Sequence, residues 1–306
     1  MTTRPNPSSD SPHTSVMVDE LLEFLQVRPG GRYIDCTVGA GGHSAAILEA
    51  SSPDGRVLGL DADPQALAIA SERLAPYAGR FELTQTYSSG AADAAAAAGF
   101  TSVDGVICDW GVSSMQLDTP QRGFSFREEG PLDMRFGPDA ELTAADIVNE
   151  YSEEELARVL YEYGDEWRSR RIAHVIVERR PLHSTTDLAK AVEQAAGKGR
   201  KSIPFSRVHP ATKTFLALRL AVNQELRHLS DFLALARGLL GFGSRLVILT
   251  FHSLEDRLVK NFLRDNSRGE NPAFHLLIKK VVRASADEVR RNPRSRSARL
   301  RAAEAA

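Results

Sequence analysis

The segment YIDCTVGAGGH, residues 33–43, constrains the fold of this chain more than any other stretch. Two apolar residues lead to Asp35, three glycines follow between positions 39 and 42, and apolar residues at helical spacing come next. Glycine tolerates the positive φ angles of a tight turn and allows a ligand close to the backbone. The free N–H groups of the helix that follows point toward the same place. The pattern predicts a strand, a glycine turn and a helix, with a ligand at the turn.

A second acidic residue supports a cofactor at that turn. The run RVLGLD, residues 56–61, is typical of a strand, and Asp61 lies 20 residues after Gly41. This separation suits a carboxylate that binds a ribose, although G-x-G-G departs from the dinucleotide motif G-x-G-x-x-G. The glycine turn alone is explained equally well as a structural turn and as a ligand-binding turn. With Asp61 it predicts a bound adenosine-type cofactor.

The first 109 residues alternate between strand and helix patterns, which predicts a parallel, doubly wound sheet with ligands at the carboxyl ends of its strands. Asp63 is the expected N-cap of a helix that has Pro64 in its first turn. The expected segments after the glycine turn are strands 56–61, 80–85 and 103–109 and helices 64–74 and 91–98. The residues at or just after the strand ends are Asp35, Asp61, Tyr87 and Asp109.

The pattern changes after Asp109. Residues 110–136 are rich in Gly, Pro and Ser without a clear period, and long loops of this kind are usually functional. The expected later elements are helices 152–164, 167–179 and 186–196, a basic loop 198–210, one long helix 211–240, a glycine turn 241–243, a strand 245–251, a helix to about 264 and closing strands 274–282 and 298–303. This organisation predicts a helical insert, 115–212, within a core formed by 1–114 and 213–306.

Composition and charge restrict the class of protein. No apolar run reaches the roughly 20 residues of a membrane span, and the polar N-terminus, expected to be a disordered tail, lacks the apolar core of a secretory signal. Two cysteines without CxxC spacing or nearby ligand pairs predict reduced, buried thiols in a cytoplasmic protein, with no zinc or other metal site.

The net charge of −2 conceals an uneven distribution. Residues 1–110 carry 6 Lys and Arg against 14 Asp and Glu, whereas 165–213 carry 11 against 5. A polyanion is attracted to the basic part, which includes Lys198, Arg200 and Lys201. A solvated helical face is the alternative reading of the same residues.

Five blocks of sequence resemble the bacterial ribosomal RNA small subunit methyltransferase H family. They are HTSVMVDE (13–20), DCTVGAGGHS (35–44), DWGVSSMQLD with RGFSF and GPLDMR (109–135), HPATKTFLALR (209–219), and FHSLEDR with NPRSRSARLR (251–301). The resemblance implies a class I S-adenosylmethionine methyltransferase with a Rossmann-like sheet and a mostly helical insert that recognises RNA. It implies transfer of a methyl group from S-adenosyl-L-methionine to the exocyclic N4 of a cytidine in the decoding region of 16S rRNA, as free rRNA or in the small ribosomal subunit.

The resemblance also implies a set of cofactor-binding residues. Tyr87 stands where many relatives have Phe, and Trp110 stands where Leu is usual, so the motif here reads DWG. The implied residues are Gly41, Gly42, His43, Asp61, Tyr87, Asp109 and Gln116.

Asp109 is the candidate catalytic residue. A carboxylate can accept a hydrogen bond from the exocyclic amine and hold its nitrogen in line with the methyl group. The alternative is that Asp109 binds the cofactor only. Asp35 either favours the cationic sulfonium or caps the glycine turn, and His252 either lines the pocket or is structural. An NAD-linked oxidoreductase and a non-catalytic RNA-binding protein on an adenosyl-binding scaffold are the alternative functions.

Overall fold

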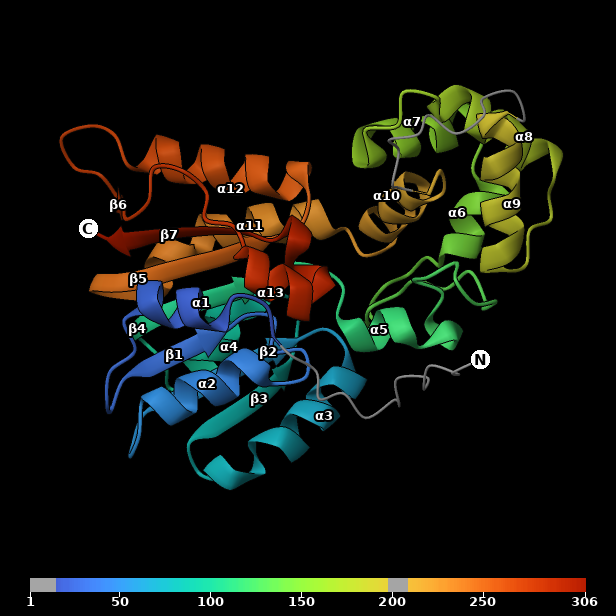
Figure 1. Cartoon of the computed structure of the whole chain (residues 1–306). Helices are drawn as coiled ribbons and strands as arrows, with labels where there is room; N and C mark the ends of the chain where they lie inside the picture. Colours follow the sequence, from blue (N-terminus) through green and yellow to red (C-terminus); the bar gives the residue numbers. More distant parts are fainter. Residues whose placement is uncertain (1–14, 198–208) are drawn as a thin grey trace.

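The computed structural model describes residues 15–197 and 209–306. The expected N-terminal tail and most of the basic loop, including Lys198, Arg200 and Lys201, lie outside this range. Seven strands form one sheet in the order β3-β2-β1-β4-β5-β7-β6 (Figure 1). The strands are β1 (Arg32–Asp35), β2 (Arg56–Asp61), β3 (Phe81–Gln85), β4 (Val103–Asp109), β5 (Leu240–Thr250), β6 (Phe274–Leu276) and β7 (Arg299–Ala305).

Strand register brings the acidic strand ends together. β1 pairs in parallel with β2 and β4, and β5 continues the parallel sheet beside β4. Asp61, at the end of β2, and Asp109, at the end of β4, therefore lie at the same edge. The last strand, β7, runs antiparallel between β5 and β6. The predicted doubly wound α/β fold is confirmed, with an antiparallel strand at one side.

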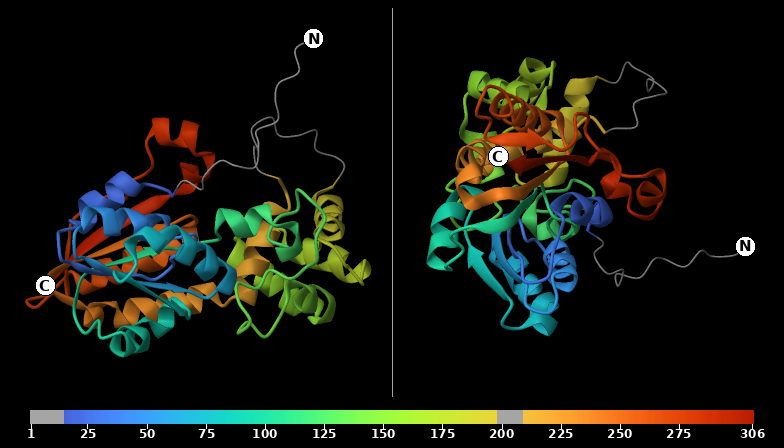
Figure 2. Two further views of the ribbon diagram at one scale, coloured as in Figure 1. Left: turned by 90° about the horizontal axis from the view of Figure 1, so that it is seen from below. Right: turned by 90° about the vertical axis from the view of Figure 1, so that its left-hand side faces the viewer.

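Helices cover both faces of the sheet, as the views in Figures 1 and 2 show. On one face, α1 (Val18–Leu25), α2 (Gly42–Ala50) and α3 (Pro64–Leu74) pack Leu21, Ile47 and Leu74 against the sheet. On the other face lie α4 (Ala91–Ala97), α11 (Glu225–Leu239) and α12 (Ser253–Asn266). Because the central strands are buried on both faces, their sequences are nearly continuous apolar runs.

A second group of helices lies beside the sheet, past the carboxyl ends of its strands (Figure 1). Its apolar cluster extends from Phe124 to Val222 and is separate from the two clusters that cover the sheet. Three of its helices begin with capping boxes, one of which joins Ser152 and Glu155. The helices are α6 (Ala144–Glu150), α7 (Glu153–Gly164), α8 (Ser169–Glu178), α9 (Thr185–Ala196) and α10 (Thr212–Val222).

The expectation of one long helix over 211–240 is wrong. α10 ends at Val222 and α11 starts at Glu225, because Gln224 adopts a left-handed conformation with φ of 46°. Asn223 fixes this break: its amide oxygen accepts from the Phe136 backbone N–H (2.7 Å) and its amide nitrogen donates to the Met134 carbonyl (2.7 Å). The break therefore reflects contacts with a distant loop.

Two other local expectations also differ from the structure, and two short helices lie outside the expected elements. Gly241 and Gly243 lie within β5 rather than in a turn, and the register of β5 against β4 shifts there, as expected where glycines allow an irregular strand. The strand expected over 274–282 stops at Leu276, three residues before the first of two consecutive lysines. Helices α5 (Ser114–Asp118) and α13 (Ala286–Arg291) have too few residues to show a period.

Both cysteines are buried and free, as expected: Cys108 lies in β4, and Cys36 directly follows the neighbouring strand β1. None of the helices in the described parts of the chain has the length and hydrophobicity needed to span a membrane. Within residues 15–197 and 209–306 there is also no group of three or more His, Cys, Asp or Glu side chains placed to hold a metal ion.

Candidate active site

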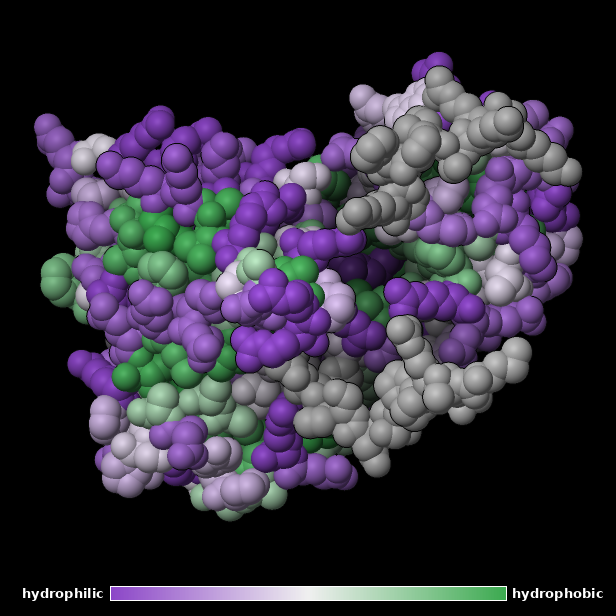
Figure 3. All heavy atoms as spheres, viewed as in Figure 1, coloured by the Kyte–Doolittle hydropathy of each residue, from purple (hydrophilic) through white to green (hydrophobic). Residues whose placement is uncertain are grey.

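A cavity opens at the carboxyl edge of the sheet, between the sheet and the second group of helices. Figure 3 shows the surface hollowed in this region. The turns after β1, β2, β3 and β4, the segment 111–117 and the junction of α10 with α11 contribute its walls. Of the predicted site residues, those that line it are Gly42, His43, Asp61, Tyr87, Asp109 and Gln116.

The glycine turn forms one wall. Gly39 and Gly41 have φ angles of 51° and 78°, in the left-handed region that favours glycine. Gly39 lines the cavity, and its N–H donates to Asp61 Oδ2 (2.8 Å). Gly41 is buried away from the cavity wall, and a Cβ there would lie 3.2 Å from Ala70 Cα of α3. Gly41 thus shapes the turn and allows α3 to pack closely against it.

Asp61 is held rigidly at the end of β2. Its second oxygen, Oδ1, accepts from the Asp63 N–H (2.9 Å). Burial raises the pKa of Asp61 to about 6, although the backbone donors of Asp63 and Gly39 oppose the shift. A carboxylate has about four acceptor positions, so Asp61 keeps capacity for ligand hydroxyls on its cavity side.

Asp109 lies across the cavity at the end of β4. Its backbone N–H donates to Thr37 Oγ1 (2.6 Å), which fixes the residue against the glycine turn. Oδ2 is 3.6 Å from His43 Nδ1, and Oδ1 is buried without a hydrogen-bond partner among the described residues. Burial raises the pKa of Asp109 to about 6; His43 opposes this shift, and the carboxylates of Asp35 and Glu255 add to it.

His43 connects Asp109 to the N-terminal segment. Its Nε2 lies 2.9 Å from the Val16 carbonyl oxygen. Because a carbonyl oxygen only accepts, Nε2 carries the proton of this hydrogen bond, and Nδ1 faces Asp109. The backbone therefore orients the ring so that Nδ1 faces the carboxylate, at a distance longer than a hydrogen bond.

Asp35 and His252 occupy structural positions. Asp35 does not line the cavity; it accepts from the Thr37 N–H (3.2 Å) and Ser44 Oγ (2.7 Å), as a cap of the turn would. His252 also lies outside the cavity lining, with Nε2 2.6 Å from Glu255 Oε1. Asp35 still acts on the site through its charge, because it raises the pKa of Asp109.

Tyr87 has an aromatic partner that the sequence did not indicate. His228 of α11 stacks on it with a centroid separation of 4.0 Å and an interplanar angle of 3°. Ser89 Oγ contacts His228 Nδ1 (2.8 Å) and orients the imidazole. Burial raises the pKa of Tyr87 to about 12, so its hydroxyl stays protonated at neutral pH. More than 130 residues separate the two rings, and no local motif marks the pair.

Gln116 is fixed by contacts within the protein. It is the third residue of α5, and its Oε1 accepts from the Ser113 N–H (2.9 Å) in a capping box. Its Nε2 donates to Asp63 Oδ2 (2.8 Å). Both ends of the amide are therefore occupied, and the side chain joins α5 to the start of α3.

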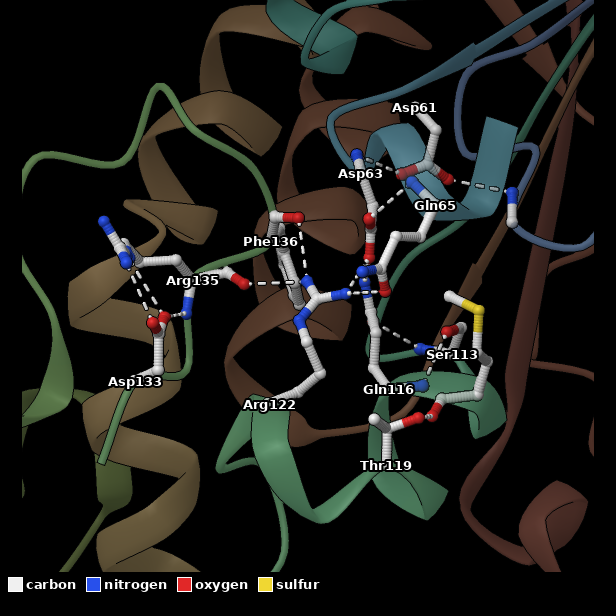
Figure 4. A network of polar contacts seen from close by, with 12 residues as sticks. Asp61, Asp63, Gln65, Ser113, Gln116, Thr119, Arg122, Asp133, Arg135 and Phe136 are labelled. Atoms are coloured by element: carbon white, nitrogen blue, oxygen red, sulfur yellow. Dashed lines mark hydrogen bonds and ion pairs between the residues drawn. The ribbon is translucent and has the colours of Figure 1, made fainter. Parts of the chain in front are cut away.

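Asp63 is the centre of a network shown in Figure 4. It caps α3 as predicted, by accepting from the Gln65 N–H (3.0 Å). The structure adds an ion pair between Asp63 Oδ2 and Arg122 Nη1 (2.7 Å), with the Asp63 side chain only 1% exposed. Arg122 Nη2 also donates to the carbonyls of Arg135 and Phe136 (both 2.9 Å). The residues beside the ribose-binding candidate Asp61 are thus tied to the loop that enters the helical group.

Buried charges form the opposite wall. Arg219 of α10 pairs with Glu225 of α11 through Nε and Oε1 (2.7 Å), and its Nη2 lies 3.7 Å from Glu255 Oε1. Arg219 and Glu225 line the cavity. The sequence signal is an arginine within the apolar run LALRLAV, but nothing local identifies its partner. Trp110 also lines the cavity while packing into the apolar cluster of α11.

The cavity fits S-adenosyl-L-methionine. Asp61 can bind ribose hydroxyls, Tyr87 offers an aromatic face for adenine, and the open backbone at Gly39 allows close approach. Oδ1 of Asp109 is buried and has no hydrogen-bond partner among the described residues, so one acceptor at this edge is left unsatisfied by the protein. With the strand order and the antiparallel β7, these features define a class I S-adenosyl-L-methionine-dependent methyltransferase.

Comparison with known proteins gives the family. Residues 10–306 match the MraW methylase family, and the chain belongs to it. Two relatives are each named ribosomal RNA small subunit methyltransferase H. That of Dehalococcoides mccartyi is 47% identical over 96% of this chain and 86% of the relative. That of Thermomicrobium roseum is 50% identical over 95% of this chain and 93% of the relative.

The chain is also similar to the structure of TrmN from Thermus thermophilus, with a TM-score of 0.45 and 15% identity, over 95% of this chain and 48% of that one. The resemblance found in the sequence and the predicted cofactor are confirmed by the family. A methylase family does not support the NAD-linked oxidoreductase alternative.

Proposed function

We propose that this protein transfers the methyl group of S-adenosyl-L-methionine to the exocyclic N4 of a cytidine in the decoding region of 16S rRNA, in the cytoplasm. Asp109 carries the proposal, because it places a buried, unpartnered carboxylate oxygen at the edge of the sheet where the cofactor binds. The names of the relatives support rRNA as the substrate. The base and the atom rest on the sequence resemblance and on the chemistry of this carboxylate.

In this proposal the cofactor supplies an electrophilic methyl group, and the protein positions the nucleophile. The lone pair of an exocyclic cytosine amine is delocalised into the ring, so the amine is a weak nucleophile. Asp109 accepts a hydrogen bond from one amine hydrogen, which directs the nitrogen and stabilises the positive charge that develops on it. A pKa of about 6 leaves Asp109 mostly ionised at neutral pH and able to take up a proton.

The other predicted residues serve the cofactor in this proposal. Asp61 binds the ribose, Tyr87 faces the adenine, and the backbone at Gly42 and His43 closes the glycine turn. Gln116 supports the cofactor site indirectly, because its amide oxygen accepts from Ser113 and its amide nitrogen donates to Asp63.

Labelled S-adenosyl-L-methionine supplied with unmethylated small subunits, and separately with naked 16S rRNA, tests the reaction. Label on cytosine N4 in the decoding region supports it, and the better acceptor identifies the substrate. Label on another base or atom would refute the assigned specificity. Cofactor and RNA binding without transfer in either arm would instead favour the non-catalytic RNA-binding protein.

The role of Asp109 requires a separate measurement. Asp109→Asn keeps a hydrogen-bond acceptor but removes the charge, so single-turnover transfer at saturating cofactor should fall by about 10²-fold or more. Calorimetric affinity for the cofactor should change much less. Full recovery of the rate at saturating cofactor would show that Asp109 binds the cofactor only and that another group holds the amine.

A further inference from the structure

The turn between α7 and α8 exposes an aromatic side chain beside arginines. The side chain of Trp167 is 72% exposed, and the guanidinium carbon of Arg168 lies 4.4 Å from its ring centroid. Tyr161, near the end of α7, is also exposed and contributes to the same groove. Single exposed aromatic residues are common on protein surfaces. The fixed backbone, the position and the charged neighbours of Trp167 distinguish it from such a residue.

The backbone on both sides of Trp167 is held in place. Glu166 is buried, its backbone N–H donates to the Leu160 carbonyl (3.3 Å), and its Oε1 accepts from the Arg168 N–H (3.0 Å). Ser169 is buried and its N–H donates to the Glu166 carbonyl (3.0 Å). The fold therefore presents the indole on a fixed turn, and a fixed aromatic residue loses little conformational entropy on binding.

The turn also lies close to the cavity. Asp165, two residues before Trp167, accepts from Ser253 Oγ through Oδ2 (3.3 Å) and from Lys213 Nζ through its carbonyl (2.7 Å). Ser253 begins α12, two residues after Phe251, which lines the cavity. The turn is thus anchored to the carboxyl edge of the sheet, on the side where Asp109 lies.

The groove around Trp167 suits single-stranded nucleic acid. Four arginines contribute to its lining, together with three glutamates at the start of α7. Two of those glutamates are engaged: Glu153 lies 3.1 Å from His174 Nδ1, and Glu155 binds Ser152 in the capping box. Proteins that bind single strands combine cationic groups for phosphates with aromatic rings on which bases stack. The arginines are Arg158, Arg168, Arg170 and Arg171.

We propose that Trp167, backed by Arg168, is a stacking platform for an unpaired RNA base near the target nucleotide, and that Arg158, Arg170 and Arg171 bind adjoining phosphates. This inference rests on the proposed function, because it assumes an RNA substrate. A base taken out of its helix for methylation leaves unstacked neighbours. A platform at the cavity edge binds such a neighbour and keeps the substrate strand open.

The platform is tested with Trp167→Ala, Trp167→Phe and the matched control Phe242→Ala. Phe242 is also exposed, but it lies in β5 near the amino end of β4, at the opposite edge of the sheet. Affinity is measured for a fluorescently labelled single-stranded RNA with the decoding-region sequence and for unmethylated small subunits. Thermal unfolding and calorimetric cofactor binding check that each variant is folded.

Loss of one stacking contact should raise the Kd of the Trp167→Ala protein for RNA about 5- to 150-fold. Trp167→Phe should recover most of this affinity, and Phe242→Ala should bind as the wild type does. RNA should change the tryptophan emission of the wild type much more than that of Trp167→Ala.

A Kd for Trp167→Ala within about twofold of wild type would overturn the platform, since one stacked base contributes more than that. A loss restricted to small subunits, with unchanged affinity for the single strand, would also overturn it and indicate a protein contact. Methyl transfer by the wild type separates the two proposals. If the wild type methylates cytosine N4 normally and Trp167→Ala binds RNA normally, only the stacking platform is refuted. If the wild type transfers no methyl group to RNA, the proposed function is refuted.

Discussion

Replacing Asp109 with Asn should make the cofactor-free protein more stable at neutral pH while impairing methyl transfer. Burial raises the pKa of Asp109 from 3.8 to about 6. Each pKa unit corresponds to about 1.4 kcal/mol, so ionising Asp109 in the folded protein disfavours folding by at most ~3 kcal/mol. The side chain is 24% exposed, and solvent screening reduces this value to about 1–3 kcal/mol.

The pH dependence follows from the raised pKa. Near the unfolded value of 3.8, the folded protein keeps Asp109 protonated and the effect is small. The buried carboxyl must ionise as pH rises through its folded-state pKa of about 6. The stability that the protonated form gives the folded protein is therefore lost over this range. Asn cannot ionise, so the stability advantage of Asp109→Asn should grow by about 1–2 kcal/mol between about pH 4.5 and about pH 7.5.

Urea unfolding of cofactor-free wild type and Asp109→Asn at several pH values measures this difference. The change of the difference with pH is the decisive quantity, because the substitution also alters hydrogen bonding by a constant amount. Asp93→Asn, at an exposed position in α4, is the control for the same substitution outside the cavity. A constant difference for Asp109→Asn would show that Asp109 has an ordinary pKa.

Three further changes test the neighbouring contacts. Asp61→Asn should weaken calorimetric cofactor binding about 10- to 150-fold, the effect of losing one charged hydrogen bond, and an unchanged Kd would exclude Asp61 as the ribose ligand. Arg122→Met leaves Asp63 buried without its cation and should lower the free energy of unfolding, measured in urea, by up to about 3–5 kcal/mol. The double variant with Asp63→Asn should recover part of this loss. If it recovers none, the broken ion pair is not the source of the loss. Trp110→Ala should raise the apparent KM for RNA in steady-state assays while Trp110→Leu remains active, and a fully active Ala variant would limit Trp110 to a packing role.

The sequence predicts the sheet well because its signals are local. Each parallel strand is a short apolar run that ends in an acidic or polar residue, and the glycine turn and the cap at Asp63 depend on neighbours within a few positions. The same rules fail at Gln224, where a helical pattern continues but the backbone is turned by contacts of Asn223 with the loop at 134–136.

Several side chains of the candidate site could not be predicted for a related reason. The stack of His228 on Tyr87 and the pair of Arg122 with Asp63 join residues that are remote in the sequence. Hydrophobic periodicity indicates which face of a helix or strand is buried. It does not indicate which distant polar side chain contacts that helix or strand. Gly41 illustrates the converse, since its position in the motif suggests a ligand while the structure places it against α3.

The placement of the second helical group between β4 and β5 has a consequence for how the molecule assembles. These two strands are neighbours in the sheet, yet all of the chain between Asp109 and Leu240 separates them. Pairs that distant form slowly, because the entropy of closing the connection is lost before the strands contact each other. Helices α7, α8 and α9 follow one another with short connections, so they can form their own apolar contacts early.

We therefore expect folding in two phases, with amides of α7–α9 protected in pulsed hydrogen exchange before those of β5 and β7. Simultaneous protection of both sets would show that the sheet and the helices form as one unit. In the two-phase order, the early helical unit shortens the effective length of the connection and brings β4 and β5 within reach of each other. The cavity, whose walls require both strands, is then the last part of the molecule to form.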